Sequence, residues 1–465
     1  MMVDKKSKEP KKRVILLLLS LAGLGMQIAI YAGFWLKIYY PYLSHLGRVN
    51  FYQNAHVLVV GLYLLLLFFF QNTYGGLKIG YLKPMEVYFS QVFSLLVVNA
   101  ISYVQISLLR NWIAPVQPIL SCMAVQLAFS AVWTWFCYRI YRRIFPPRKL
   151  LLVYGERPIE DILHKFSTRK DKFVVAKCIN ILEGTQAVEK EAEKDYDAMV
   201  LWDIPTHHRN RLLKFCYGRS LRVYMMPKIT DVLIQGSEQL HLFDTPIFLT
   251  RENPLTVEQR VVKRLIDIFC ALILLVTAAP FMLVTAVVIK LYDGGPVLYK
   301  QIRCTKDQKE FFILKFRSMQ VDAEKDGVAR LATRNDARIT PIGRFIRAVR
   351  IDELPQLFNI LKGDMSFIGP RPERPEIITQ YVEEMPEFVF RMKVKAGLAG
   401  YAQVYGKYNT TPYDKLKLDL AYIENYTVWL DIKLMLLTLK ILFKPESTEG
   451  VDSSQITAMK KEEDR

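Results

Sequence analysis

The sequence predicts a membrane protein with four N-terminal transmembrane helices, a Rossmann-like α/β domain, and a C-terminal monotopic α+β domain with a re-entrant broken helix. Three observations lead to this fold class. Long apolar runs begin the chain, strand-like and helix-like segments alternate in its middle, and a further apolar run with an internal proline precedes a region rich in cations.

Composition favours a membrane or a phosphate-bearing substrate over nucleic acid. The chain has 465 residues, of which 51% are hydrophobic, and a formal net charge of +18. Because the basic residues are interleaved with long apolar runs, anionic lipids or phosphorylated substrates are the expected partners. The six cysteines form no C-x-x-C pair, which is typical neither of a disulfide framework nor of a zinc site. Soluble parts that face a reducing cytosol fit this pattern.

Residues 1–147 are predicted to form the transmembrane region. Each of its four apolar runs is long enough to cross about 30 Å of hydrocarbon as a helix. They are Val14–Leu36, Phe51–Phe70, Met85–Leu109 and Val116–Ile140. Basic clusters at 5–13 and 139–149 predict that both ends of this region are cytoplasmic. Four crossings return the chain to its starting side, so charge and span count agree.

A fifth apolar run, Leu265–Leu291, contains Pro280 near its middle. Proline removes a helix hydrogen bond and clashes with the preceding turn, so a kink or break is expected there. The helical part before the break, Leu265–Ala279, would extend about 22 Å at 1.5 Å per residue. We therefore predict a re-entrant helix at 265–291 with both ends cytoplasmic. A kinked helix that crosses the membrane is the alternative.

Residues 148–255 are predicted to form a cytoplasmic Rossmann-like α/β domain. Strand-like segments at 149–155, 171–179, 195–203 and 221–227 alternate with helix-like segments at 156–166 and 207–218. This alternation is typical of a parallel sheet. The first turn carries Gly155 alone instead of G-x-G-x-x-G, so no dinucleotide is expected. A regulatory or packing role is the favoured interpretation.

The C-terminal region concentrates cations around a predicted hairpin and a predicted helix. Residues 296–304 and 310–319 alternate in polarity around a polar turn, and Lys315 and Arg317 should share one face of the second strand. Pro341 should begin a helix that carries a stripe of basic residues, namely Arg344, Arg347 and Arg350. The "GPRP" stretch at 369–372 should hold Arg371 rigidly. Arginine offers paired donors to a phosphate, so a phosphate site is the sharper interpretation and a solvated stripe the plainer one.

Asp352 and Glu353 form an acid pair within the stretch "RIDELPQLFNI". A helix-capping role for Asp352 is one explanation, because carboxylates are favoured near a helix N-terminus. The nearby cations support another. A carboxylate among cations stays ionised and can act as a nucleophile or metal ligand, and a second can help hold Mg²⁺ against a pyrophosphate.

The ordered stretches "KRLIDI…AAPF", "GPVLYKQIR", "ILKFRSM", "IDELPQLFNILKGDMSFIGPRP" and "KVKAGLAGYAQV" resemble the bacterial sugar transferases, which are monotopic phosphoglycosyl transferases. The resemblance covers about Gln259–Gly450. Preceding spans and an α/β domain are similar to the long-form polyprenyl glycosylphosphotransferases that start exopolysaccharide or capsule repeat units. "KAGLAG" departs from the more usual K-P-G-x-T-G, so a loop contact there is in doubt.

This resemblance implies a phosphoglycosyl transferase catalytic domain at 256–450 in the bacterial inner (cytoplasmic) membrane. Such an enzyme moves a sugar-1-phosphate from a UDP-sugar to undecaprenyl phosphate and releases UMP. Implied roles are Asp352 as nucleophile, Asp352 and Glu353 as ligands of Mg²⁺, and phosphate binding by Lys315, Arg347 and Arg371. We expect Arg317 to join this phosphate-binding set, because it should share one strand face with Lys315. The transferred sugar is left open, and a homodimer is suggested by analogy alone.

A membrane scaffold and a transporter are the two alternative function classes. A non-catalytic membrane scaffold would be favoured by a degraded acid pair or a missing P-R-P, and both are intact. A transporter would need more spans with charged residues inside them. Asp419 and Asp431 are expected as surface carboxylates, with a polar supporting role as the alternative, and residues 451–465 as a disordered tail.

Overall fold

The computed structural model describes residues 8–45, 53–321, 336, 338–406 and 410–442. Backbone contacts divide the chain into two compact units, Met1–Pro227 and Lys228–Arg465. The domain boundaries drawn from the sequence at 147, 255 and 450 stay predictions. The expected tail at 451–465 lies outside the described residues.

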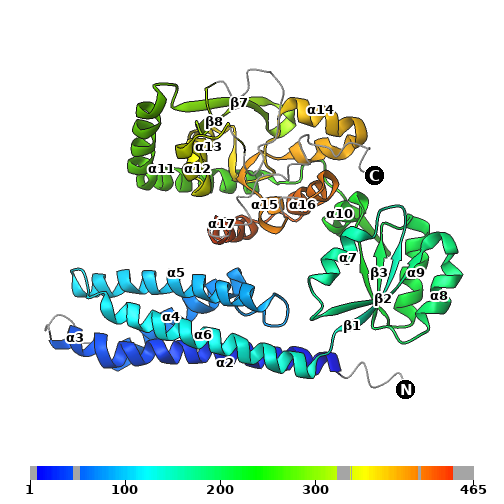
Figure 1. Ribbon diagram of the computed structural model, residues 1–465, viewed down its shortest axis with the longest axis horizontal. Coiled ribbons are helices and arrows are strands. Elements are labelled where there is room, and N and C mark those ends of the chain that lie inside the picture. Colours follow the sequence, from blue (N-terminus) through cyan, green and yellow to red (C-terminus); the bar gives the residue numbers. More distant parts are fainter. Residues whose placement is uncertain (1–7, 46–52, 322–335, 337, 407–409, 443–465) are drawn as a thin grey trace. The chain divides into compact units, whose positions relative to one another are not determined.

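Four long helices build the first part of unit 1. They are α2 (Lys8–Phe34), α4 (Gln53–Tyr74), α5 (Pro84–Arg110) and α6 (Gln117–Ile144). Helix α2 contacts α4 and α6, and α5 contacts the same two helices, so the four form a closed bundle (Figure 1). After α2 the chain continues through η1 (Trp35–Tyr39) and α3 (Tyr40–His45). Helical structure in the four apolar runs is confirmed, while the number of membrane crossings stays a prediction.

A parallel sheet builds the rest of unit 1. Its strands are β1 (Arg148–Tyr154), β2 (Phe173–Asn180), β3 (Ala198–Trp202) and β4 (Arg222–Met225), in the order β2-β1-β3-β4. Three helices cover it, namely α7 (Glu160–Ser167), α8 (Thr185–Ala192) and α9 (Thr206–Gly218). Helix α7 packs on the face that contains Leu150 and Leu152, and α8 and α9 pack on the face of Leu151 and Val153 (Figure 1). The predicted strands are confirmed, and α8 is an element that the sequence reading missed.

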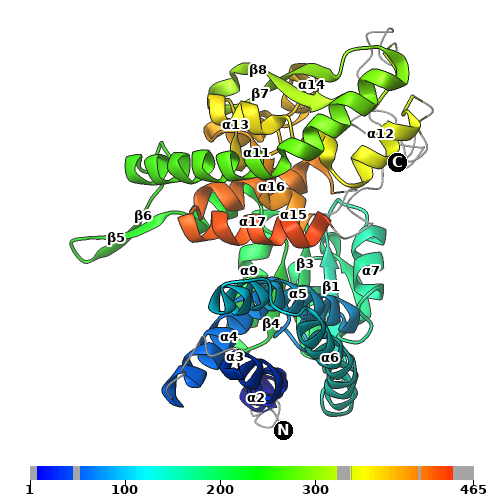
Figure 2. The ribbon, with the colours of Figure 1, turned by 90° about the vertical axis from the view of Figure 1, so that its left-hand side faces the viewer.

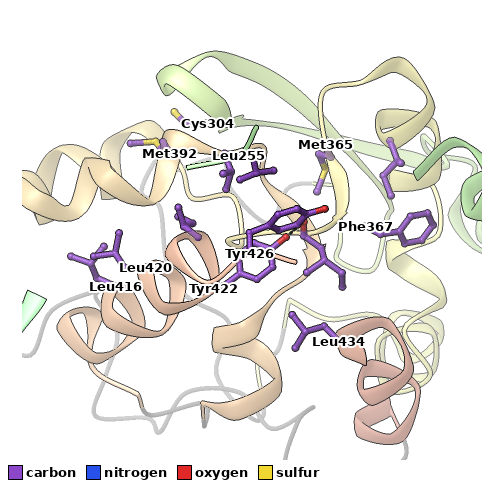
Figure 3. Close-up of a cluster of buried hydrophobic side chains, with 14 of the residues drawn as sticks. Leu255, Cys304, Met365, Phe367, Met392, Leu416, Leu420, Tyr422, Tyr426 and Leu434 are labelled. Atoms are coloured by element: carbon purple, nitrogen blue, oxygen red, sulfur yellow. Dashed lines mark hydrogen bonds between the residues drawn. The ribbon is translucent and has the colours of Figure 1, made fainter. Parts of the chain in front are cut away.

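Unit 2 has one apolar core that draws on segments far apart in the chain. It includes residues from α10 (Ile229–Gln235), α13 (Gln356–Lys362), β9 (Ser366–Ile368), η5 (Pro386–Lys393), α16 (Pro412–Glu424) and α17 (Val428–Leu442). Figure 3 shows the rings of Tyr422 and Tyr426 at the centre, with Met365, Phe367 and Leu434 around them. Helix α13, which directly follows the acid pair in the chain, packs into this core.

The predicted hairpin is confirmed as an antiparallel pair, β7 (Leu298–Cys304) and β8 (Glu310–Phe316). Its register pairs Leu298 with Phe316 and Cys304 with Glu310. The turn η3 (Lys306–Gln308) contains Asp307 at φ 55°, a left-handed conformation that Asp and Asn tolerate better than most residues. The hairpin places Lys315 near the end of β8.

Helix α11 (Val257–Asp293) is one continuous helix that contains Pro280, so the structure shows a kink at most and not the predicted break. Thr256 and Gln259 form a capping box at its start, and Gly294 ends it at φ 70°. Figures 1 and 2 show its ribbon changing direction along its length, as expected where Pro280 removes a backbone donor. The Thr277 hydroxyl donates to the Ile273 and Leu274 carbonyls just before Pro280, a side-chain-to-backbone contact that often accompanies a bend in a helix.

Helix α11 is one of five described helices long and apolar enough to cross a membrane. Its apolar side chains are largely exposed, including Phe269, Val276, Phe281 and Leu291. Such a surface needs a non-aqueous cover. Both a re-entrant and a crossing course would provide one, so the re-entrant course stays a prediction.

Buried polar contacts fix the first half of α11 to the core of unit 2. The Lys263 ammonium lies 2.6 Å from Asp431 Oδ2 and donates to the Ile368 carbonyl at 2.9 Å. Asp267 accepts hydrogen bonds from the Ser366 hydroxyl and the Phe367 amide at 3.0 and 2.9 Å. The expectation that Asp431 is a surface carboxylate is therefore wrong, because its partner lies 168 positions away in the sequence.

We expect Asp431→Ala to lower the melting temperature of the full-length protein, because it leaves the Lys263 charge buried without its partner. Removing one member of a buried pair costs about 3–5 kcal/mol. The double variant Lys263→Met with Asp431→Leu should recover most of the loss. Thermal unfolding in detergent measures this, with the exposed Glu376→Ala as control. Equal melting temperatures for Asp431→Ala and the control would contradict the anchoring role.

Candidate functional site

The acid pair lies in a 3₁₀ turn, η4 (Ile351–Glu353), between two short helices. Helix α12 (Pro341–Ala348) precedes it and begins at Pro341 as predicted, where the Thr340 hydroxyl accepts from the Gly343 amide. Helix α13 follows, with Pro355 at its N-cap and no side-chain cap bond. The structure thus gives Asp352 no helix-capping contact, so the capping explanation is wrong for α13.

Arg350 leaves the predicted basic stripe. Helix α12 ends at Ala348, and Arg350 adopts φ 60°, which costs a non-glycine residue roughly 1–2 kcal/mol. Its guanidinium comes within 3.9 Å of Glu353 Oε1. The prediction of one continuous stripe from Arg344 to Arg350 is therefore wrong. The helix ends before Arg350, and the left-handed backbone there directs its side chain toward Glu353.

Glu353 is the most heavily compensated carboxylate of the site. Its Oε1 atom lies 3.3 Å from Lys315 Nζ, 3.1 Å from Arg371 Nη2 and 3.9 Å from Arg350 Nη1. Burial alone would raise the pKa of Glu353, but Lys315, Arg371 and Arg350 outweigh it and hold that pKa well below its usual range. Glu353 is therefore a permanent anion that fixes its cations in place.

Asp352 is buried beside Glu353 but has none of the direct ion pairs that Glu353 forms. Only 8% of the residue is exposed, and its Oδ1 atom has no hydrogen bond from the described residues. Burial, together with the neighbouring Glu353 charge, raises the pKa of Asp352 to about 6, against the opposing pull of Lys315, Arg347 and Arg350. An ionised but uncompensated oxygen of this kind is suited to nucleophilic attack or to a metal ion.

A rigid loop supplies Arg371, as the sequence predicts. Gly369 and Gly397 approach so closely that a Cβ on Gly397 would lie 2.1 Å from the Gly369 nitrogen. The Gly397 amide donates to the Pro370 carbonyl at 2.9 Å, which locks the loop against β10 (Gly397–Ala399). The Arg371 side chain is thus held over Glu353 by backbone contacts.

A second charge cluster supports this loop, and the sequence reading missed it. Arg391 donates to the Arg371 carbonyl at 3.0 Å and pairs with Asp419 at 2.7 Å. Glu373 pairs with Arg391, Arg303 and Lys415, whose charges lower the pKa of Glu373 to about 2 although burial opposes them. Asp419 is only 1% exposed, so its expected surface position is wrong. These ion pairs could not be predicted, because their members lie far apart in the sequence. The acid that directly follows P-R-P, Glu373, was the one local feature that pointed to them.

Asn359 aligns the strand that carries Lys315. Its buried side chain accepts from the Leu314 amide at 3.0 Å and donates to the Phe312 carbonyl at 2.8 Å. The amide thereby takes the place of a neighbouring strand along one edge of β8. Lys315 is the next residue after Leu314, so these bonds also position its ammonium group beside Glu353.

Two of the predicted phosphate-binding residues lie outside the Glu353 cluster. Arg317 follows the end of β8, and its buried guanidinium forms an ion pair with the exposed Asp293 at the end of α11. Arg347 is half-buried on α12, close enough for its charge to act on Asp352. The structure therefore brings Asp352, Glu353, Lys315 and Arg371 together, and phosphate binding by all four cations stays a prediction.

The acid pair is compatible with a metal ion held only partly by the protein. No group of three or more His, Cys, Asp or Glu side chains that could hold a metal occurs within the described ranges. Mg²⁺ commonly takes one or two carboxylates and completes its shell with water and substrate phosphates. The unpartnered Asp352 Oδ1 atom suits this role, whereas Glu353 Oε1 already serves three cations.

These features define a class: a protein with helices long and apolar enough to cross a membrane and with a buried acid pair surrounded by cations. A family model described as bacterial sugar transferase matches residues 258–445. The chain is 34% identical over 319 residues to the UDP-N-acetylgalactosamine-undecaprenyl-phosphate N-acetylgalactosaminephosphotransferase of Aeromonas hydrophila, covering 66% of this chain and 70% of that protein.

Two further relatives agree with this match. A UDP-glucose:undecaprenyl-phosphate glucose-1-phosphate transferase of Caulobacter vibrioides is 38% identical over 190 residues, which are 40% of this chain and 71% of the relative. One of the same name from Escherichia coli K12 is 37% identical over 221 residues, 46% of this chain and 47% of the relative. The chain belongs to the bacterial sugar transferases, as a polyprenyl glycosylphosphotransferase.

We expect Asp352→Asn to stabilise the folded protein at pH 8. The folded pKa of Asp352 is raised to about 6 from an ordinary 3.8, so the ionised form destabilises the fold above about pH 6. That penalty is absent below about pH 3, where the carboxyl is protonated in both states. The gain should therefore be of the order of 1–3 kcal/mol at pH 8 and close to zero at about pH 3.

Melting curves of the full-length protein at both pH values measure this difference. The matched control is Asp307→Asn on the hairpin turn, where the side chain is 75% exposed. An Asp352→Asn protein that melts at or below the wild-type temperature at pH 8 would rule out an uncompensated buried carboxylate.

Proposed function

We propose that the protein transfers a sugar-1-phosphate from a UDP-sugar to undecaprenyl phosphate, through a covalent intermediate on Asp352. The observation that carries this proposal is the contrast within the acid pair. Glu353 is neutralised by Lys315, Arg350 and Arg371, while Asp352 keeps a buried oxygen without a partner. Family membership supplies the reaction class, because the relatives are named as undecaprenyl-phosphate sugar transferases.

In the first step an Asp352 oxygen attacks the phosphorus that carries the sugar. The bond from that phosphorus to the oxygen bridging the two phosphates breaks, so UMP leaves with the electron pair and an acyl phosphate forms. Lys315 and Arg371 stand beside the carboxylates and can neutralise phosphate charge as it redistributes. Phosphoryl transfer depends mainly on such alignment and neutralisation.

In the second step an oxygen of undecaprenyl phosphate attacks the same phosphorus, and the bond to Asp352 breaks. The products are undecaprenyl-diphospho-sugar and the free carboxylate. The largely exposed apolar surface of α11 supports a site at the membrane surface, where a lipid acceptor and a soluble donor can meet. This reaction would be the first membrane step of exopolysaccharide or capsule synthesis.

We further propose that Mg²⁺ assists, held by Asp352 Oδ1 together with phosphate oxygens of the donor. When bound, the ion would neutralise charge on the transferred phosphoryl group. Glu353 would act mainly on the cations and on the pKa of Asp352, and the ion pairs of its Oε1 atom support this division.

UMP release from a panel of UDP-sugars, with undecaprenyl phosphate and Mg²⁺, tests the reaction. One or more sugars should give turnover, and Asp352→Asn should lower kcat by at least a thousandfold because the nucleophile is lost. The exposed Asp307→Asn variant should retain wild-type activity. Normal turnover by Asp352→Asn would refute the assigned nucleophile, and a wild-type protein inactive on the whole panel would refute the reaction.

We also propose that four N-terminal crossings and a re-entrant α11 leave both soluble regions in the cytoplasm. Single cysteines replacing Lys170 and Lys309, which are both exposed, should then react with an impermeant maleimide only after the cells are opened. A cysteine at the exposed Trp112, between α5 and α6, should react in intact cells. The parent chain is the blank, since its cysteines are buried or half-buried. Labelling of the Lys309 site in intact cells would mean that α11 crosses the membrane.

A further inference from the structure

A small recess beside the acid pair has a lining that the first transfer step does not yet use. Its polar lining consists of Arg303, Lys315, Gln356 and Arg371, with Gly397 and Leu398 on another side. Neither Asp352 nor Glu353 is among its described lining residues, and no other acid is either. A recess lined by cations and an amide, without a carboxylate, is suited to an anion.

Gln356 contributes a side-chain amide to the lining of the recess. The residue is only 3% exposed and no hydrogen bond joins its side chain to another described residue, yet its amide atoms are not among the fully enclosed groups without a partner. The amide therefore opens onto the recess, where a ligand or a water molecule can bond it. Its NH₂ group can donate to an oxygen of a bound anion.

The cations of the recess connect it to the acid pair. Lys315 and Arg371 contact Glu353 and also line the recess, whereas Arg303 lines the recess and donates to the Pro372 carbonyl at 3.1 Å. Burial lowers the pKa of Arg303 to about 10, with Glu373 opposing and Arg371 and Arg374 adding to the decrease. An anion in the recess would relieve this crowding of positive charge.

Reaction geometry separates two phosphate positions. In phosphoryl transfer the attacking and leaving oxygens lie roughly in line on opposite sides of the phosphorus. A phosphate attacked by Asp352 must therefore direct its leaving group away from that carboxylate. Lys315 and Arg371, shared between the acid pair and the recess, span these two positions.

We propose that the recess holds the phosphate of the departing nucleoside monophosphate, and that Gln356 donates a hydrogen bond to it. Arg303 and Gln356 would then bind the leaving group without touching the transferred phosphoryl group. This inference rests on the proposed function for its choice of nucleotide. It assigns two residues to the site that the sequence reading did not name.

Binding of UMP to the full-length protein in nanodiscs, measured by calorimetry, tests the assignment without any need for turnover. Gln356→Glu is close in shape, removes the donor and adds a negative charge. We expect it to weaken UMP binding about tenfold or more and to leave uridine, which lacks the phosphate, unaffected. Gln380→Glu, on the exposed face of α14 (Pro375–Glu384), is the matched control.

Each other outcome decides against the assignment. Wild-type protein that does not bind UMP, or a Gln356→Glu protein that binds it as tightly as wild type, would overturn it. Equal loss of UMP and uridine affinity would place the nucleoside in the recess instead of the phosphate. If Gln356→Glu does not fold, the neutral Gln356→Met should still weaken UMP binding several-fold relative to wild type. UMP release from UDP-sugars is scored separately, so a failure of the proposed reaction stays distinguishable from a failure of this phosphate position.

Discussion

The contact between one glutamate oxygen and three cations is the interaction on which the rest of the site depends. Glu353 Oε1 forms ion pairs with Lys315, Arg350 and Arg371, which belong to three separate segments of the chain. Because Glu353 accepts these contacts, its neighbour Asp352 is left with a buried oxygen that has no hydrogen-bond partner and with a pKa of about 6. Two adjacent carboxylates thus acquire different properties from their surroundings, in the way that enzymes commonly separate the roles of paired acids.

Much of the remaining architecture holds the three cation-bearing segments in place. Asn359 fixes the backbone of β8, and the close approach of Gly369 and Gly397 fixes the loop of Arg371. Ion pairs behind that loop, centred on Arg391 and Glu373, keep it from moving away from the acids. Helix α11 is tied to the same core through Lys263 and Asp267, so the apolar helix and the acid pair share one rigid support.

Features encoded locally in the sequence were predictable. The hairpin around Lys315 follows from alternating polarity, and the bend of α11 follows from Pro280. The predicted stiffness of the loop at Arg371 is also local, because Pro370 and Pro372 flank this residue. These cases depend on neighbours within a few positions, where backbone preferences act directly.

Features that depend on distant partners were not predictable. Spacing by three suggested one stripe through Arg350, but a left-handed residue after α12 redirects that side chain. Lys315 and Arg317 looked equivalent, yet Arg317 pairs with Asp293 once β8 has ended. Asp419 and Asp431 resembled surface acids because nothing near them in the sequence reveals Arg391 and Lys263.

The most direct test of the account is the mass of the protein after brief exposure to its donor without the lipid acceptor. The account predicts one sugar-phosphate per chain on the peptide that contains Asp352, with UMP released in equal amount. Addition of undecaprenyl phosphate should then remove the adduct. An adduct on another residue, or transfer to the lipid with no adduct on a protein that is otherwise active, would contradict the central claim that Asp352 is the nucleophile.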